Sequence, residues 1–106
     1  MAKGLRYLND DNFQQEINSG VTLVDFYADW CGPCRMMEPI INDLVDELED
    51  KVKIAKIDIE SAQRTAASFQ VTSIPTIIVF KDGVEVERLV GLKDKETLKR
   101  TLTRFA

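Results

Sequence analysis

The stretch Trp30-Cys31-Gly32-Pro33-Cys34 holds both cysteines of the chain. It follows an almost continuously apolar segment, Val21–Ala28, which predicts a strand covered on both faces. From about Cys34 onward, apolar residues recur at the spacing of a long helix.

Two residues three positions apart on a helix have β-carbons about 5 to 6 Å apart, whereas a disulfide needs roughly 3.5 to 4.5 Å. The first turn can adjust, because the capping residue is not helical and Pro33 suits the opening turn. The pair can therefore form and break a disulfide.

A position at a helix N-terminus also changes the acidity of the two cysteines. Unpaired N–H groups and the positive end of the helix dipole favour a thiolate over a thiol. The effect is greatest nearest the helix end, so Cys31 is predicted to be the exposed nucleophile. Cys34 lies one turn further in and is predicted to be the more buried, less acidic thiol that resolves a mixed disulfide.

Length and composition limit the class of protein. The 106 residues are 44% hydrophobic with a formal net charge of −4, which predicts one domain, residues 1–106, with a substantial core. The longest apolar run, Ile77–Phe80, is far shorter than the roughly 18 residues of a membrane span. Met1–Phe13 lacks the apolar stretch of a signal peptide, so we expect a cytoplasmic protein. The acidic balance and the lack of a basic patch argue against nucleic-acid binding.

Strand and helix patterns alternate along the chain. The expected strands are Leu5–Leu8, Val21–Ala28, Val52–Ile59, Ile77–Lys81 and Val84–Val90. Three of the expected helices are a long one that starts near Cys34, a short one over about Ala62–Phe69, and a last one over Lys95–Phe105. A further helix, with Asp10 or Asp11 as its cap, is expected to carry Phe13 and Ile17 on one side and to end near Gly20. Asp82-Gly83 is a hairpin-turn sequence, so the last two strands are predicted to be antiparallel.

One carboxylate, Asp25, lies inside a strand that is predicted to be buried. An unpaired buried carboxylate is costly, so a compensating partner is expected. Lys56 follows Val52 and Ile54 on one side of its own strand and is the natural candidate. A plain buried ion pair is one interpretation. In the other, burial raises the pKa of Asp25 so that it accepts the Cys34 proton, directly or through a water.

Taken together, these features resemble those of the thioredoxin family over nearly the whole chain. The matching segments are Trp30-Cys31-Gly32-Pro33-Cys34, Val24-Asp25-Phe26, Lys56 with Asp58, Ile74-Pro75-Thr76, Lys81-Asp82-Gly83 and Gly91. The resemblance implies an α/β thioredoxin fold, with a five-stranded mixed sheet in the order 1-3-2-4-5 flanked by four helices. Tyr27 departs from the pattern, since many members have tryptophan there.

The same resemblance implies a protein-disulfide reductase that is recycled by a thioredoxin reductase. It supports Asp25 as the proton acceptor, with Lys56 modulating it. It also implies a cis bond between Ile74 and Pro75, with the Ile74 backbone pairing with substrate as an added strand would. The surface expected to bind a target comprises Trp30, Gly32, Pro33, Ile74, Pro75, Val90 and Gly91; for Trp30, core packing is the alternative. The expected substrates are disulfide-containing proteins, and the chain is expected to be a monomer.

Other functions are less consistent with the residues. A structural zinc site needs four cysteine or histidine ligands, whereas this chain has two cysteines and no histidine, so no metal is expected. A purely structural disulfide would close too short a loop to stabilise the fold much. No G-x-G-x-x-G fingerprint occurs, so no bound cofactor is expected. A disulfide oxidase or isomerase usually has a histidine between its cysteines, in contrast to Gly32-Pro33. A redox-independent binding subunit or clamp, using the apolar surface around the motif, stays open as an alternative.

Overall fold

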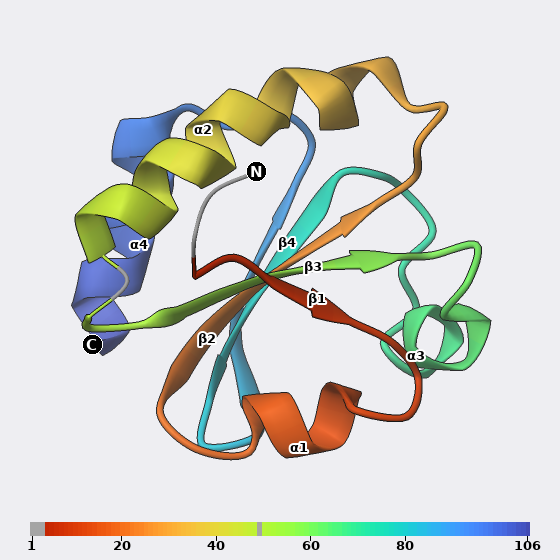
Figure 1. Ribbon diagram of the computed structural model, residues 1–106, viewed down its shortest axis with the longest axis horizontal. Coiled ribbons are helices and arrows are strands. Elements are labelled where there is room, and N and C mark those ends of the chain that lie inside the picture. Colours follow the sequence, from red (N-terminus) through yellow and green to blue (C-terminus); the bar gives the residue numbers. More distant parts are fainter. Residues whose placement is uncertain (1–3, 49) are drawn as a thin grey trace.

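A five-stranded mixed sheet, ordered β1-β3-β2-β4-β5, forms the centre of the computed structural model, which describes residues 4–48 and 50–106 (Figure 1). The elements in chain order are β1 (Arg6–Leu8), α1 (Phe13–Ile17), β2 (Val21–Tyr27), α2 (Gly32–Leu48), β3 (Lys53–Asp58), α3 (Gln63–Ser68), β4 (Thr76–Lys81), β5 (Val84–Val90) and α4 (Lys95–Phe105). Strands β1, β3 and β2 are parallel, while β4 is antiparallel to β2 and β5 is antiparallel to β4. The α/β fold and the sheet order implied by the family resemblance are confirmed.

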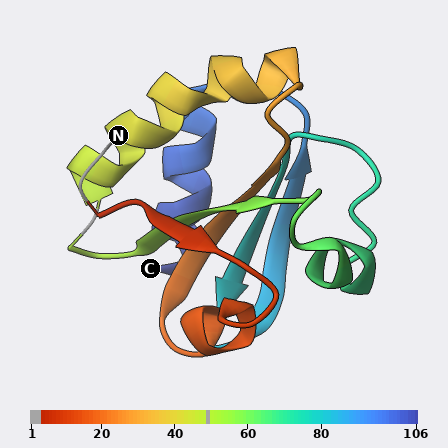
Figure 2. The same ribbon diagram turned by 45° about the vertical axis from the view of Figure 1, so that its right-hand side comes forward.

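Helices cover both faces of the sheet, with α2 and α4 on one side and α1 and α3 on the other (Figures 1 and 2). Successive residues of a strand point to opposite faces. In β2, Leu23 therefore packs with Met37 and Leu98 under α2 and α4, whereas Val24 and Phe26 pack under α1 and α3. This double cover explains why β2 is apolar at almost every position.

The position of α2 follows directly from the end of β2. Strand β2 ends at Tyr27, and α2 begins at Gly32, two residues earlier than the pattern starting at Cys34 predicts. Pro33 is tolerated there because the first N–H groups of a helix have no partner within the helix. The predicted apolar stripe is confirmed, since Met37, Ile41, Leu44, Val45 and Leu48 are all buried. Towards the other end of α2, Glu47 accepts hydrogen bonds from Lys95 and Lys99, at 2.7 and 2.9 Å, and so links α2 to α4.

The expected cap of the first helix is wrong. Helix α1 begins at Phe13 after Asn12, and neither Asp10 nor Asp11 caps it. The Asn9 side chain closes this turn instead, accepting hydrogen bonds from the N–H groups of Asp11 and Asn12 at 2.9 and 2.8 Å. The Asp10 carboxylate is then free to accept from the N–H and hydroxyl of Thr65 in α3, at 2.9 and 2.7 Å.

The last two strands form the predicted antiparallel hairpin. Asp82 and Gly83 both have positive φ, +50° and +86°, as a two-residue turn that matches the strand twist requires. Helix α4 has its predicted bounds, Lys95–Phe105, and is capped by Asp94, whose side chain accepts a hydrogen bond from the Thr97 N–H at 2.9 Å. Within residues 4–48 and 50–106, no helix has the length and apolar character needed to cross a membrane.

Candidate active site at the N-terminus of helix α2

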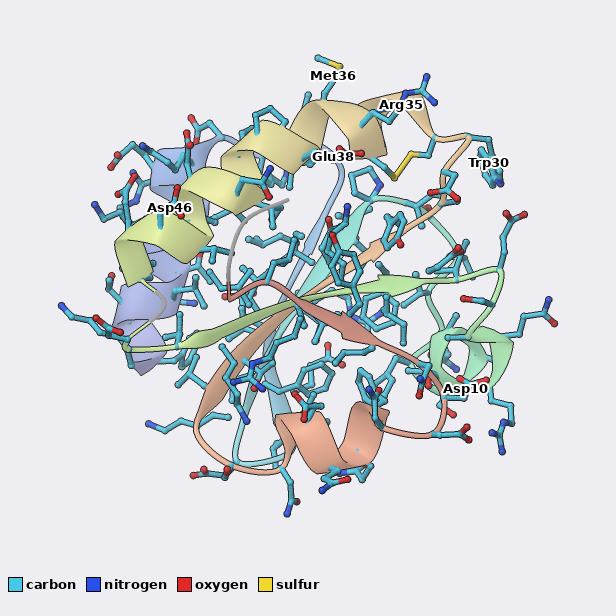
Figure 3. The ribbon with its side chains drawn as sticks, in the orientation of Figure 1. Asp10, Trp30, Arg35, Met36, Glu38 and Asp46 are labelled. Carbon is cyan, nitrogen blue, oxygen red and sulfur yellow. A yellow bond between two sulfur atoms is a disulfide. The ribbon has the colours of Figure 1, made fainter. Side chains whose placement is uncertain are left out.

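Cys31 and Cys34 form a disulfide at the start of α2, with their Cα atoms 5.2 Å apart (Figure 3). Cys31 ends the loop that follows β2, and Cys34 lies in the first helical turn. The Cys34 N–H donates to Cys31 Sγ at 3.2 Å. A backbone donor at a helix N-terminus stabilises negative charge on the atom that it faces. The arrangement therefore favours a thiolate at Cys31 when the disulfide opens.

Both sulfur-bearing side chains are almost completely covered. Cys31 is 5% exposed and Cys34 is 3% exposed. Cys34 is buried as predicted, whereas the prediction of an exposed Cys31 is wrong for the disulfide form. The two cysteines pack with Ala28, and Tyr27, Ile59 and Ile74 lie against this cluster. Neighbours from three separate segments thus cover Cys31, which was predicted to be exposed, as well as Cys34.

Trp30 precedes Cys31 and points away from the body of the protein (Figure 3). Its side chain is 63% exposed, which rules out the core-packing alternative. Arg35, on the other side of the motif, donates to the Asp29 carbonyl at 2.9 Å and so ties the start of α2 to the preceding loop. This hydrogen bond between the two residues that flank the motif holds the motif in place, while the Trp30 side chain stays outside the core.

The segment around Pro75 lies beside the disulfide. The Ile74–Pro75 peptide bond is cis, as the resemblance implies. Ile74 packs against the cysteine cluster, and the Gly91 N–H donates to the Pro75 carbonyl at 2.8 Å. Val90 closes the ladder between β4 and β5 opposite Thr76 and is half exposed. The expected binding residues Ile74, Pro75, Val90 and Gly91 are therefore brought together, although they come from two segments of the chain.

Asp25 is completely buried, and neither of its carboxylate oxygens has a hydrogen-bond partner among the described residues. It shares the strand face of Leu23, which is the face covered by α2. Burial raises the pKa of Asp25 to about 7, the Lys56 cation opposes this rise, and the Glu38 carboxylate on α2 adds to it. A carboxyl with this pKa can both take up and release a proton near neutrality.

Lys56 is the register partner of Asp25 in the parallel pair β2–β3, as the alternation in its strand suggests. It is 8% exposed, but it makes no direct ion pair with Asp25 among the described residues. Its ammonium instead lies over the ring of Tyr27, with Nζ 4.3 Å from the ring centroid. Lys56 is the partner of Asp25 by position and by the effect of its charge, as predicted. The alternative of a plain buried ion pair is wrong, because the flexible lysine stem reaches Tyr27, the next residue along the same face.

The comparisons with known proteins agree with this geometry. The family model described as Thioredoxin matches residues 4–104. The chain belongs to the thioredoxin family. It is 50% identical to a thioredoxin of Chlamydia muridarum, over 94% of this chain and 97% of that protein. It is 48% identical to a thioredoxin of Staphylococcus haemolyticus, over 90% of this chain and 91% of that protein. A solved mutant thioredoxin from Halobacterium salinarum superimposes with a TM-score of 0.84 at 36% identity, covering 99% of this chain and 95% of that one.

Membership of the thioredoxin family, together with the Cys31–Cys34 disulfide, makes the chain a thiol-disulfide oxidoreductase. Sequence reasoning missed one residue of this thioredoxin-family site, Ile59, and one contact, that between Tyr27 and Lys56. Ile59 covers the disulfide from the segment after β3, and no periodic pattern marks it. Tyr27 holds the Lys56 ammonium; its position two residues after Asp25, on the same strand face, could have indicated this contact.

Proposed function

We propose that this protein is a general protein-disulfide reductase. The observation that carries the proposal is the disulfide at the N-terminus of α2, where the Cys34 N–H faces Cys31 Sγ. The neighbouring segment supports it, because Ile74 packs against the cysteine cluster and β4 begins two residues later, at Thr76. Gly32 and Pro33 between the cysteines, in place of a histidine, favour reduction of targets over oxidation.

The reaction proceeds by two thiol–disulfide exchanges. In the reduced protein, the Cys31 thiolate attacks one sulfur of a target disulfide, which forms a mixed disulfide and releases the other target sulfur as a thiolate. Cys34 then loses its proton and attacks Cys31 Sγ, which releases the second target sulfur. Two electrons pass to the target, and the Cys31–Cys34 disulfide forms again. A thioredoxin reductase then supplies two further electrons, which reduce the Cys31–Cys34 disulfide to the dithiol again.

Asp25 is the proposed acceptor of the Cys34 proton, directly or through a water. Its burial and its pKa of about 7 support this role, since a general base is most effective when its pKa is close to the working pH. Lys56 is a positioning residue that limits how far the Asp25 pKa rises. The Cys34 side chain is 3% exposed in the disulfide form. A thiol at this position has little access to bulk water as an alternative proton acceptor.

The proposed docking surface surrounds Cys31. Trp30 and Val90 offer exposed apolar area, and Gly32, Pro33, Pro75 and Gly91 leave the approach to the sulfur free of long side chains. The Ile74 backbone pairs with an extended segment of the target, and this mode of recognition depends on main-chain hydrogen bonds more than on sequence. The protein then acts as a monomer on many disulfide-containing proteins, in the cytoplasm.

Reduction of insulin in the presence of a thioredoxin reductase and NADPH tests the proposal. NADPH consumption and precipitation of the insulin chains are expected with the unmodified protein and not with the Cys31→Ser, Cys34→Ser double variant. Lack of insulin reduction by the unmodified protein would contradict the proposal. Full biological activity of the double variant would favour the clamp, and a potential as oxidising as that of periplasmic oxidases would favour disulfide formation.

A further inference from the structure

The contact between Lys56 and Tyr27 takes no direct part in the two thiol–disulfide exchange steps. The Lys56 ammonium is nearly buried and lies 4.3 Å from the centroid of the Tyr27 ring, which is within the range of a cation–π interaction. The strand register pairs Lys56 with Asp25 and pairs Tyr27 with Asp58. Because residues two apart share a strand face, all four side chains lie on the face that α2 covers. Lys56 thus has an aromatic ring and a carboxyl within reach on the same surface.

The charged and titratable groups around Asp25 come from strands β2 and β3 and from helix α2. Lys56 is on β3, Tyr27 is on β2 itself, and Glu38 is on α2 (Figure 3). The two cysteines at the start of α2 are joined in the disulfide. From β4, the register partner of Asp25 is the uncharged Ile77, and on the far side of Lys56 the register partner in β1 is Tyr7. Lys56 is therefore the one cation among the described groups that face this carboxyl.

We propose that Tyr27 is a positioning residue for the resolving step: its ring binds the Lys56 ammonium and holds this cation beside the Asp25 carboxyl rather than in contact with it. The inference rests on the proposed role of Asp25 as proton acceptor. It assigns Tyr27 a function through Lys56, since Tyr27 does not itself exchange a proton with the cysteines.

The location of the cation matters because Asp25 must change its charge during the reaction. An ammonium in direct contact favours the ionised form of a carboxyl and lowers its pKa by about 1 to 3. A carboxylate held in this way is a weak base for a thiol proton at neutral pH. With Lys56 on the ring, burial remains the largest effect on Asp25 and its pKa stays close to 7. The cation then moderates the effect of burial without fixing the carboxyl in its ionised form.

Tyr27 provides a neutral ring at every pH at which the reaction is measured. Burial and the nearby carboxylates of Asp58 and Asp29 raise the pKa of the Tyr27 hydroxyl to about 12. Its titration therefore cannot produce a change of rate near neutrality. The hydroxyl is also separable from the ring, so Tyr27→Phe keeps the aromatic face and is the matched control for Tyr27→Leu, which removes it.

The test is the titration of the Asp25 carboxyl in the oxidised protein, followed by carbon NMR of its side chain. Tyr27→Leu should lower the pKa of Asp25 by about 1, a tenfold change in proton affinity, because Lys56 can then contact the carboxylate. Tyr27→Phe should leave the titration as in the unmodified protein. In a Lys56→Met background, Tyr27→Leu should no longer lower the pKa of Asp25, because the cation on which Tyr27 acts is absent. An equal effect with and without Lys56, or no effect of Tyr27→Leu, would overturn the inference.

A measurement on the unmodified protein keeps the inference testable if Tyr27→Leu does not fold. The ring current of Tyr27 should shift the proton resonances of the Lys56 Cε group upfield, and resonances at ordinary lysine positions would contradict the contact. The rate of the resolving step separates this inference from the proposed function. A lowered Asp25 pKa without a matching change in the pH–rate profile supports the Tyr27 contact and contradicts Asp25 as the proton acceptor.

Discussion

Asp25 combines complete burial, oxygens without hydrogen-bond partners and a pKa of about 7. If it accepts the Cys34 proton, Asp25→Asn should slow the resolving step near pH 7 by about 100-fold, a typical contribution of a general base. The deficit should shrink as the pH rises past the ordinary thiol pKa of about 8.5, because Cys34 then ionises without help. Stopped-flow measurement of target release from a preformed mixed disulfide, as a function of pH, checks this expectation.

The control for this measurement is Asp46→Asn, which neutralises an exposed carboxylate on α2 away from the motif (Figure 3). It should leave the pH–rate profile as it is. If Asp25→Asn gives the same profile as the unmodified protein, Asp25 has no part in the proton transfer.

At the residue scale, the sequence predicts which groups meet more successfully than how they touch. The period of two in β2 and β3 correctly places Asp25 and Lys56 on one face. It contains no information on the rotamer of a lysine stem, so the contact with Tyr27 was missed. The contribution of Ile59 to the cover over Cys31 was missed for a related reason, since Ile59 reaches it from a segment far away in the sequence.

The helices differ in where their first turns find hydrogen-bond acceptors. Helix α3 has no side-chain cap at its own start, and Asp10 supplies this cap from the loop before α1. Hydrogen bonds from the Thr65 hydroxyl and N–H hold the pKa of Asp10 below its ordinary value. Asp10→Ala should therefore destabilise α3, with amide exchange at Thr65 about five- to tenfold faster at neutral pH, as expected for loss of a cap.

The effect of Asp10→Ala should depend on pH in a fixed direction. A carboxyl with a lowered pKa stabilises the folded state above its ordinary pKa of 3.8, and this stabilisation is lost as the pH falls through the lowered value. Hydrogen exchange of α3 at successively lower pH follows the loss. Asp11→Ala removes a neighbouring, far more exposed carboxylate and is the control. Equal effects of the two substitutions would contradict the cap.

The turn between β4 and β5 provides a second test at the scale of elements. Gly83 has φ of +86°, and a Cβ built on it would meet the Asn18 side chain only at 3.6 Å, an ordinary contact. Gly83→Ala should therefore lower the free energy of unfolding by about 1 to 2 kcal/mol through backbone strain alone. Urea denaturation measures this loss. Gly32→Ala, where no positive φ and no close neighbour stand in the way, should show no comparable loss.

Nearby residues made helix α4 and the β4–β5 hairpin predictable, although the local cap of α1 was predicted wrongly. Helix α4 has the predicted bounds because Asp94 caps it only three residues from Thr97. The hairpin was predictable because Asp82-Gly83 carries its own turn conformation. The cap of α3 was not predictable, because Asp10 and Thr65 are 55 positions apart in the chain.

At the scale of the whole molecule, Asp25 makes stability depend on pH. Its pKa is raised from 3.8 to about 7 in the folded protein, so the unfolded chain ionises first as the pH rises, and folding is penalised progressively between these values. Relative to Asp25→Asn, the unmodified oxidised protein should lose on the order of 4 kcal/mol of unfolding free energy between pH 4 and pH 8. Denaturant titrations of both proteins across this range measure the difference.

The same denaturant titrations with Asp46→Asn show whether the buried carboxyl of Asp25 causes the pH dependence of stability. This variant should follow the unmodified protein throughout. Parallel stability curves for Asp25→Asn and the unmodified protein would mean that Asp25 ionises in the folded state as easily as in the unfolded chain.

The sheet order of the molecule came from the family resemblance and not from the periodicity of the chain. Alternating strand and helix patterns predict the number of strands and the antiparallel hairpin. They do not determine that β3 inserts between β1 and β2, because strand neighbours are chosen by packing across the whole sheet. Motifs spread from Val24 to Gly91 were needed to fix that arrangement.

The side chains that cover the Cys31–Cys34 pair affect which thiols can exchange with it. Exchange requires a thiolate to reach a particular sulfur, and 5% of Cys31 is open to solvent. Abundant small thiols that collide with the protein at random orientations therefore seldom meet that opening. In the proposed docking mode, a partner that pairs with the Ile74 backbone is oriented toward this opening before exchange begins. The oxidised pair is in this way insulated from reduction by the surrounding thiol pool.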